Sequence, residues 1–179
     1  MDFSWGKAHI GNYGNEMADR LAKQAASDSD LQIRYDSIPI SAVKNKLAAI
    51  SEDSWRAEWE SSTTGLLTKS FFPTVQDRLN TKLWLTPNLT TLLTGHGRIN
   101  YYFHRFKIKD SAVCVCGVGD QTVDHVIYDC RKLKTQRNIF IESVKKNGGT
   151  WPISKTEIVT KHAKHFAKFA KNIDLDSLQ

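Results

Sequence analysis

The 179-residue sequence has no long hydrophobic run and only 3 cysteines. No apolar stretch approaches the roughly 18 residues that a membrane-spanning helix needs, and the first residues lack the basic start and apolar stretch of a secretory signal. The cysteines all lie between Cys114 and Cys130, and an odd number in a chain without a signal peptide argues against a disulfide framework. The sequence therefore predicts an intracellular protein, nuclear or cytoplasmic, with reduced or metal-bound thiols.

Positive charge is scarce in the first third of the chain and abundant in the rest. Residues 1–60 hold 7 Lys/Arg and 10 Asp/Glu, whereas residues 61–179 hold 18 Lys/Arg and 9 Asp/Glu. The net charge of +6 therefore comes entirely from the second part. A basic region favours a polyanionic partner such as RNA or DNA, bound without sequence preference.

Hydrophobic periodicity predicts a mainly α chain with a small amount of β structure at its start. Residues 3–10 alternate large apolar with small or polar side chains, as in one short strand, which needs partner strands to pair with. Asn15 is a candidate cap for the first helix, and Pro87 suits the first turn of a later one. Helices are expected at residues 16–26, 41–60 with a kink near Ser51, 89–93, 99–106, 132–146 and 154–172.

The last of these helices has two contrasting faces. Its apolar residues fall on one side at helical spacing. Four lysines fall on the other side: Lys161, Lys164, Lys168 and Lys171. Such a lysine face either contacts a polyanion or is simply solvated.

The run from Trp5 to Lys23 resembles the end of a ribonuclease H domain. In that family a tryptophan, lysine, glycine and histidine are followed by an asparagine and a glutamate, and then by an aspartate that opens the final helix. His9, Asn15 and Asp19 stand at those spacings, with Ala8 in place of the usual glycine. The resemblance implies that Asp19 is a Mg²⁺ ligand, that His9 lies in a mobile loop beside the site, and that Lys7 and Asn15 contact nucleic acid.

The same family draws its other three carboxylates from elements upstream of this motif, and only Met1 to Ser4 precede the motif here. Two Mg²⁺ ions that each take about six oxygen ligands cannot be organised by one carboxylate, so hydrolysis by this chain alone is not expected. Either the site is idle, or a separate chain supplies the missing carboxylates. The structural alternative is a loop histidine and a first-turn aspartate favoured by the helix dipole.

Cys114, Cys116, His125 and Cys130 follow the pattern Cys-x-Cys-x₈-His-x₄-Cys. This is the ligand set of a closed, tetrahedral Cys₃His zinc site, although the first spacing is narrower than the usual two to four residues. Gly117 and Gly119 allow the chain to fold tightly after the first pair. The alternative is three buried thiols and a hydrogen-bonded helix histidine, because free cysteine is commonly a core residue.

A second resemblance connects these residues to the segment before them. The run from Thr94-Gly95-His96-Gly97 through Tyr102, Arg105 and Phe106 to the Cys/His residues is similar to the tail that follows ribonuclease H in arthropod-type non-LTR retrotransposon polyproteins. The two motifs come in the order of that family. The resemblance implies that this chain is a C-terminal piece of such a reverse transcriptase polyprotein.

Basic and aromatic residues alternate just before Cys114. The candidate nucleic-acid contacts are Arg98, Arg105, Lys107 and Lys109. Cations neutralise phosphates and exposed rings stack on bases, a combination that suits single strands. Against this, Ile99, Tyr102, Phe103 and Phe106 recur at helical spacing, which is typical of core residues.

The predicted organisation is a ribonuclease H end at residues 1–27, a linker at 28–40, a helical region at 41–110, a zinc loop at 111–135 and basic helices at 136–179. The expected function is that of a retrotransposon-derived, nucleic-acid-binding fragment with zinc as cofactor. One alternative is a component of an RNA–DNA hybrid ribonuclease, with magnesium in a completed site. Another is a zinc-stabilised module that binds a protein partner or its parent polyprotein.

Overall fold

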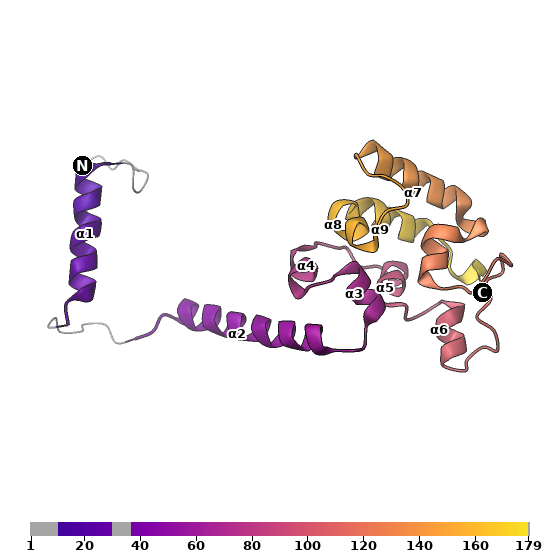
Figure 1. The fold of residues 1–179 in the computed structure, drawn as a ribbon, viewed down its shortest axis with the longest axis horizontal. Coiled ribbons are helices and arrows are strands. Elements are labelled where there is room, and N and C mark those ends of the chain that lie inside the picture. The colour runs from indigo at the N-terminus through magenta and orange to yellow at the C-terminus, as the bar shows by residue number, and fades with distance from the viewer. Residues whose placement is uncertain (1–10, 30–36, 179) are drawn as a thin grey trace. The chain divides into compact units, whose positions relative to one another are not determined.

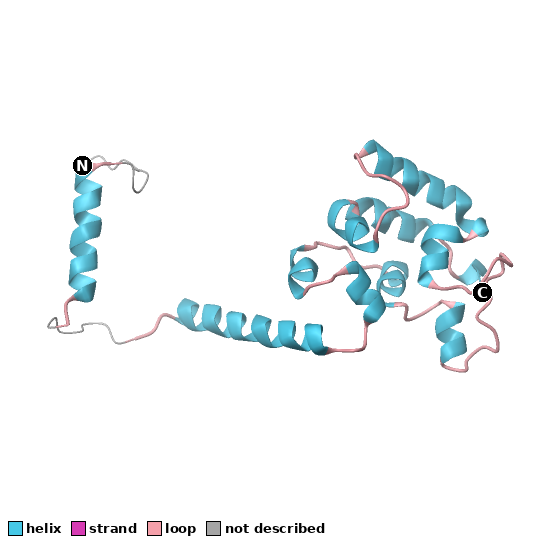
Figure 2. Ribbon diagram, viewed as in Figure 1, coloured by secondary structure: helices cyan, strands magenta, loops and turns pink. Residues whose placement is uncertain are grey.

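The computed structural model describes residues 11–29 and 37–178, and its regular structure in these ranges is helical (Figure 2). β pairing there is confined to one bridge between Val113 and Asp120. The mainly α class predicted from the sequence is therefore confirmed. The predicted strand at residues 3–10, with Lys7 and His9, lies outside the described residues. None of the described helices combines the length and apolar character needed to cross a membrane.

The helical elements follow one another along the chain and divide between two compact units, residues 1–46 and 47–179, with the boundary inside α2 (Figure 1). In order they are α1 (Tyr13–Ser27), α2 (Ile40–Ser61), α3 (Leu66–Phe71), α4 (Val75–Asn80), α5 (Pro87–Thr94), α6 (Asn100–Arg105), η1 (His125–Asp129), η2 (Arg131–Leu133), α7 (Lys134–Lys146), α8 (Lys155–Lys161), α9 (Ala163–Asn172) and η3 (Asp176–Leu178).

Helix α1 carries the second half of the ribonuclease H-like motif. Its cap is Asn12, whose side chain accepts a hydrogen bond from the Gly14 amide at 3.2 Å. The prediction of Asn15 as the cap is wrong, because the helix begins earlier, at Tyr13, and Asn15 lies in its first turn. No residue of α1 is buried within the part of the chain that the structure describes.

Helix α2 runs unbroken through Ser51, so the kink expected there is not observed. Its apolar stripe is exposed over the first turns. Near its end, Trp59 is half-buried against the core of the second unit, and its Nε1 donates a hydrogen bond to the Pro73 carbonyl at 3.2 Å. Trp59 therefore anchors the C-terminal end of α2 to this core.

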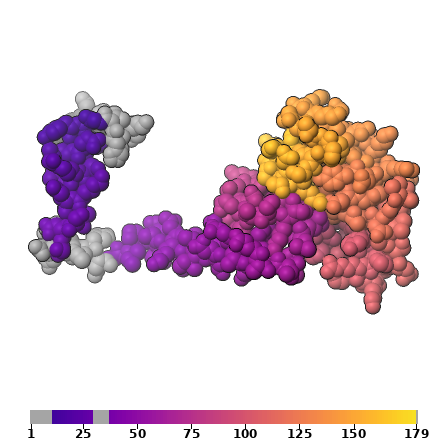
Figure 3. Space-filling model, viewed as in Figure 1, coloured from indigo at the N-terminus to yellow at the C-terminus, as the bar shows by residue number. Residues whose placement is uncertain are grey.

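The second unit has one hydrophobic core, in which the buried rings of Phe71, Phe140 and Phe166 meet with centroids 5.8–5.9 Å apart. Helix α9 packs on α5 and α7, and α3 packs on α5 and α8. The core extends along the chain from Phe71 to Leu178 and includes Cys114 and Cys130. In the space-filling view the segments from magenta to yellow accordingly lie against one another (Figure 3). The cysteine segment is therefore part of this folded unit and not an appendage.

Helix α5 has sequence signals at both ends. Pro87 occupies the first turn, and the Thr86 hydroxyl accepts a hydrogen bond from the amide three residues later at 3.3 Å. At the other end Gly95 adopts a left-handed φ of 72°, a conformation that glycine takes without steric cost. Between these ends the predicted apolar residues are buried: Leu89, Leu92 and Leu93.

The helix predicted at residues 154–172 is in fact two helices. Helix α8 begins after its cap Ser154 and ends at His162, which leaves the helical region with φ −124° and ψ 22° before α9 begins. The break allows α8 to pack on α3 while α9 packs on α5 and α7. The apolar face faces the core as predicted, and the four lysines are exposed. Periodicity therefore gives the buried face correctly but not the change of direction.

Apolar periodicity predicts the remaining long helix of the second unit but misses two short helices. The helix predicted at residues 132–146 corresponds to η2 and α7, within the usual uncertainty at helix ends. Helices α3 and α4 are not predicted by periodicity. Each has 6 residues, less than two helical turns, which is too short for a repeating apolar pattern.

Candidate metal centre and basic surface

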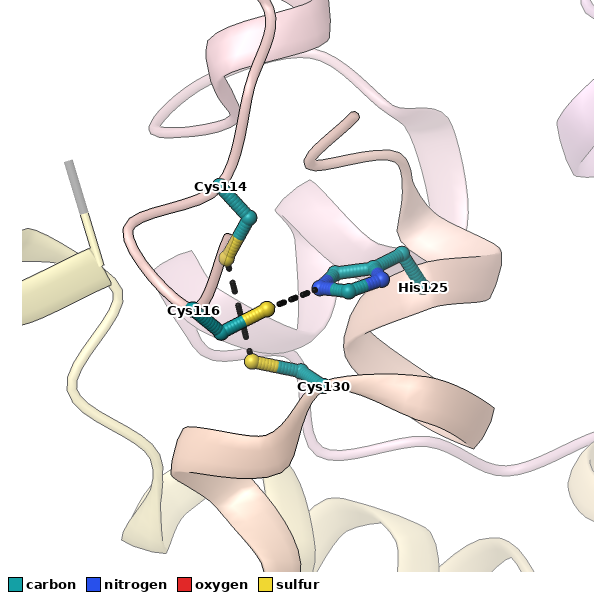
Figure 4. A group of neighbouring side chains, drawn as sticks. All are labelled: Cys114, Cys116, His125 and Cys130. Carbon is teal, nitrogen blue, oxygen red and sulfur yellow. Dashed lines mark hydrogen bonds between the residues drawn. The ribbon is translucent and has the colours of Figure 1, made fainter. Parts of the chain in front are cut away.

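Four side chains of the second unit, Cys114, Cys116, His125 and Cys130, point toward one another (Figure 4). The first two come from the loop after α6, His125 opens η1, and Cys130 directly follows η1. Their ligand atoms all lie within 4.8 Å of one another. The structure thus brings together the group that the sequence spacing predicts as a metal site. Elsewhere in residues 11–29 and 37–178, no comparable group of Cys, His, Asp or Glu is found.

The distances within this cluster are compatible with zinc. Cys114 Sγ lies 3.8 Å from Cys130 Sγ, and Cys116 Sγ lies 3.2 Å from His125 Nε2. Tetrahedral zinc, with bonds of about 2.3 Å to sulfur and about 2.0 Å to nitrogen, separates two sulfurs by about 3.8 Å and a sulfur from a nitrogen by about 3.5 Å. The four groups can therefore accept one ion with only small movements of their side chains.

A tight turn explains how a one-residue spacing serves the first two cysteines. The Gly117 amide donates to the Cys114 carbonyl at 2.9 Å, and the Cys114 amide donates to the Gly119 carbonyl at 2.9 Å. Gly117 has a left-handed φ of 73°, which a side chain would strain. The chain therefore reverses within four residues and carries Cys116 back toward Cys114, as predicted from the two glycines.

The turn η1 aligns the other two candidate ligands. The Cys130 amide donates to the His125 carbonyl, five residues earlier, at 2.7 Å, which is the hydrogen bond of a π-type turn. In an α-helix, residues five apart would lie about 140° apart around the axis, and their side chains would diverge. The wider turn places both on one side. Sequence spacing alone does not predict this turn.

Arg137 is a residue of the site that sequence reasoning missed. It is 8% exposed and reaches from α7 to the backbone of the cluster. Its Nε donates to the Ile127 carbonyl at 2.9 Å, and a terminal nitrogen donates to the Cys130 carbonyl at 2.6 Å. The sequence does carry a signal for it: with Phe140 and Val144, Arg137 occupies the core-facing stripe of α7, where a cation needs a buried partner.

Burial and hydrogen bonding give the cluster uneven protonation. Burial raises the pKa of Cys114 to about 12. Burial also acts to raise the pKa of Cys116, but backbone hydrogen bonds with Val118 and Arg131 and the neighbouring thiols outweigh it and lower that pKa. Burial lowers the pKa of His125 and so keeps its imidazole neutral, the form that binds metals. An incoming ion would meet a neutral imidazole and one readily ionised thiol.

The alternative interpretation, three buried core thiols and a hydrogen-bonded helix histidine, accounts for part of the geometry of the cluster. Cys114 and Cys130 are 1% and 0% exposed, as core cysteines often are. Cys116, however, is only half-buried, and His125 Nε2 faces its sulfur. Core packing does not require an imidazole nitrogen to converge with three sulfurs on one point, whereas a metal site does.

The predicted nucleic-acid contacts of the second unit lie on and around α6. Arg105 and Lys107 are exposed. Arg98 is also exposed but is ion-paired with Asp176 near the end of the chain. Lys109 is half-buried and donates to a side-chain oxygen of α6 at 3.1 Å. Arg105 and Lys107 are therefore the two of these four cations most open to a ligand.

The aromatic residues of this region divide between core and surface. Ile99 is 1% exposed, and Tyr102 and Phe103 are half-buried. Tyr101 and Phe106 are 49% and 54% exposed. Helical spacing alone predicts that Phe106 joins the core, but α6 ends one residue earlier, so Phe106 leaves the buried face. Exposed rings thus accompany the exposed cations.

The first unit holds the described part of the ribonuclease H-like motif. Asn15, Glu16 and Asp19 lie in α1, while Lys7 and His9 lie outside the described residues. The Asp19 carboxylate accepts a hydrogen bond from Lys23 Nζ at 2.7 Å, one helical turn later. The structure does not bring Asp19 together with other carboxylates in a metal-binding group among the described residues. Its role as a magnesium ligand stays a prediction.

The chain is similar to parts of curated Pol polyproteins of type-1 retrotransposable elements R1. It is 31% identical over 134 residues to one from Popillia japonica, covering 71% of the chain and 51% of that protein. It is 32% identical over 104 residues to one from Nasonia vitripennis (56% and 26%), and 30% identical over 89 residues to one from Bradysia coprophila (49% and 9%). The chain thus spans about half or less of each of these relatives.

These similarities confirm the predicted resemblance at the level of a retrotransposon polyprotein. No family model matches the sequence, and no solved structure matches it. The geometry of the Cys/His cluster is therefore described from this chain alone.

Proposed function

We propose that this chain is a piece of an R1-type retrotransposon polyprotein in which a zinc-stabilised helical domain contacts nucleic acid. The observation that carries the proposal is the convergence of three sulfurs and one imidazole nitrogen within 4.8 Å. The similarity to R1 polyproteins and the basic character of residues 61–179 support it. In this proposal residues 1–27 are the end of a ribonuclease H domain, 28–40 a linker, and 111–135 the zinc loop between two helical segments, 41–110 and 136–179.

Zinc would act here by fixing the loop between α6 and η2. Both cysteines of the tight turn and both ends of η1 supply ligands, so one ion would tie together segments that are otherwise joined by few backbone hydrogen bonds. The exposed cations Arg105 and Lys107 lie in the chain just before this loop. A zinc-fixed loop would therefore hold them in a constant position for contacts with phosphates.

Replacement of Arg105 and Lys107 by glutamine should weaken nucleic-acid binding and its dependence on salt. Each lost phosphate contact should reduce the slope of log affinity against log salt concentration by about 1, because fewer counterions are released. Fluorescence anisotropy with a labelled oligonucleotide at several salt concentrations measures this slope. Lys44→Gln with Lys46→Gln, in the acidic part of the chain, removes the same charge and should change the slope little.

An affinity for nucleic acid that does not change with ionic strength would contradict this proposal. A folded, zinc-loaded chain with no attraction to RNA or DNA would favour the alternative of a protein-interaction module. An observation that suits that alternative is the exposure of Val113, Val115 and Val118, at 47–51%, on the zinc loop.

A second candidate function is a part in a ribonuclease H, favoured by the spacing of His9, Asn15 and Asp19. Asp19 would be one Mg²⁺ ligand, and another chain or another part of the polyprotein would supply the remaining carboxylates. Mixing this chain with a ribonuclease H fragment that ends before the motif should restore Mg²⁺-dependent cleavage of an RNA–DNA hybrid. Asp19→Asn should abolish that cleavage, whereas Asp28→Asn, beyond the end of α1, should not.

A further inference from the structure

A pocket of about 200 Å³ lies beside α6, and four separate segments form its walls. The turn just after α5 contributes His96, α6 contributes Tyr101, Tyr102 and Arg105, the segment before η1 contributes residues 122–124, and α3 contributes one leucine. Ile99 and Val123, both buried, also line it. This volume is below the roughly 300–1,000 Å³ of pockets for drug-sized ligands, so the pocket suits one small, flat group.

One side of this pocket is aromatic. The His96 and Tyr102 rings lie with centroids 5.2 Å apart, and Tyr102 packs in turn on Phe106 at 4.7 Å. Tyr101, which is 49% exposed, lies at the surface of the same wall. Rings fixed by their neighbours offer a stacking surface to a planar ligand at little cost in side-chain entropy.

The other lining groups can recognise an edge that carries both hydrogen-bond donors and acceptors. Arg105 presents a planar donor, and Asp124 presents a carboxylate that also pairs with Lys155 Nζ at 2.6 Å. A phosphate has no planar face to stack on the rings, and in the pocket it would lie beside the Asp124 carboxylate and the buried apolar side chains of Ile99 and Val123. An aliphatic group would offer neither an acceptor to Arg105 nor a donor to Asp124. A nucleobase has a planar face for the rings and a mixed edge for these two groups.

The two main walls are held together through one buried side chain. Gln121, 0% exposed, accepts a hydrogen bond from the Asn100 amide at 2.6 Å with its side chain, and one from the Tyr101 amide at 3.3 Å with its backbone carbonyl. The next residue, Thr122, accepts a hydrogen bond from the His125 amide at 3.1 Å. The pocket wall is thus continuous with the turn that carries one metal ligand.

We propose that this pocket holds a single unstacked nucleobase of a single-stranded nucleic acid, between the rings of α6 and the segment before His125. The inference rests on the proposed function and deepens it: Arg105, whose guanidinium carries five N–H donors, would contact a base edge as well as a phosphate. Because a base inside a duplex is stacked and paired, such a site selects single strands. The proposed contacts are all to the base, so an RNA strand or a DNA strand can supply it.

Comparison of a strand with bases and a strand without them tests this site in the full, zinc-loaded chain. Anisotropy is measured with oligodeoxyuridylate, oligouridylate and an abasic oligonucleotide of the same length and charge. Loss of one aromatic–base contact typically weakens binding about tenfold. We therefore expect the base-containing strands to bind about tenfold tighter than the abasic strand. A higher affinity for oligouridylate than for oligodeoxyuridylate, which carries the same base, would identify RNA as the preferred source of the base, and the reverse would identify DNA.

Two substitutions locate the effect in the pocket. Tyr101→Ala should bring the affinity ratio of base-containing to abasic strand close to one, and because Tyr101 is half-exposed the fold should tolerate it. Arg105→Lys, which keeps the charge but loses the planar donor, should lower the ratio as well. Trp84→Ala is the matched control: it removes an aromatic ring that is 86% exposed and does not line the pocket, and it should leave the ratio unchanged.

Equal affinities for base-containing and abasic strands, with both affinities dependent on salt, would contradict the base site but would agree with the proposed function. A ratio unaffected by both Tyr101→Ala and Arg105→Lys, or lowered equally by Trp84→Ala, would also overturn it. Failure to bind any of the three strands would contradict the proposed function itself.

Discussion

Removal of the proposed zinc is expected to lower the free energy of unfolding of residues 47–179 by about 4 kcal/mol or more, because an ion held at a thousand times its dissociation constant stabilises the folded state by about that amount. For a unit of this size the melting temperature should fall by more than about 10 °C. Thermal unfolding followed by circular dichroism, with and without a chelator, measures the effect, and added zinc should reverse it.

Substitution of one ligand should have the same result without a chelator. Cys130→Ser replaces a fully buried sulfur and should give an unfolding curve that no longer responds to zinc. Val115→Ser is the matched control, since Val115 lies between the first two cysteines, is 47% exposed and supplies no ligand. An unchanged curve after chelation, in a chain whose Cys130→Ser variant is as stable as the parent, would favour the core-thiol alternative.

Arg137→Met should produce the second large effect. The substitution keeps the length and apolar character of the stem but leaves the Ile127 and Cys130 carbonyls without their buried donor. The Cys130 carbonyl keeps the Leu133 amide as a donor, but each lost hydrogen bond from the charged guanidinium contributes about 1.5–3 kcal/mol, so the unit should lose about 3–6 kcal/mol of stability. Chemical denaturation measures this loss, and Arg131→Met, at an exposed position of η2, should cost far less.

The same substitution should weaken zinc binding about 10–100-fold, the usual effect of losing a residue that supports metal ligands. Three thiolates and one Zn²⁺ ion leave a net charge of −1, and the buried guanidinium would neutralise it. Competition with a chromogenic zinc chelator gives the affinity. Arg137→Lys keeps the charge but not the paired donors, so it should lie between Arg137→Met and the parent. Unaltered zinc affinity in Arg137→Met would show that Arg137 serves packing alone.

Local sequence signals predicted those parts of the fold that local interactions decide. Helix α5 is an example, since Thr86, Pro87 and Gly95 define both of its ends without help from the rest of the chain. The break at His162 is different. It exists because α8 and α9 pack against different neighbours, and those neighbours lie far away in the sequence. Apolar periodicity contains no information about such a change of direction.

The candidate site shows the same division. Residue types and spacing were enough to select Cys114, Cys116, His125 and Cys130. They could not predict that η1 would be a π-type turn, which places His125 and Cys130 on one side, nor that Arg137 would reach back from α7. The pocket beside α6 could not be predicted from the sequence either. Its walls come from α3, α5, α6 and the segment before η1, which only the tertiary fold brings together.

The metal content of the purified chain tests the central claim most directly. Elemental analysis of protein prepared without added metal should find one zinc per chain, and the Cys116→Ser variant should lose it. A metal-free chain that nevertheless folds with the four side chains in place would contradict the zinc-stabilised domain proposed here.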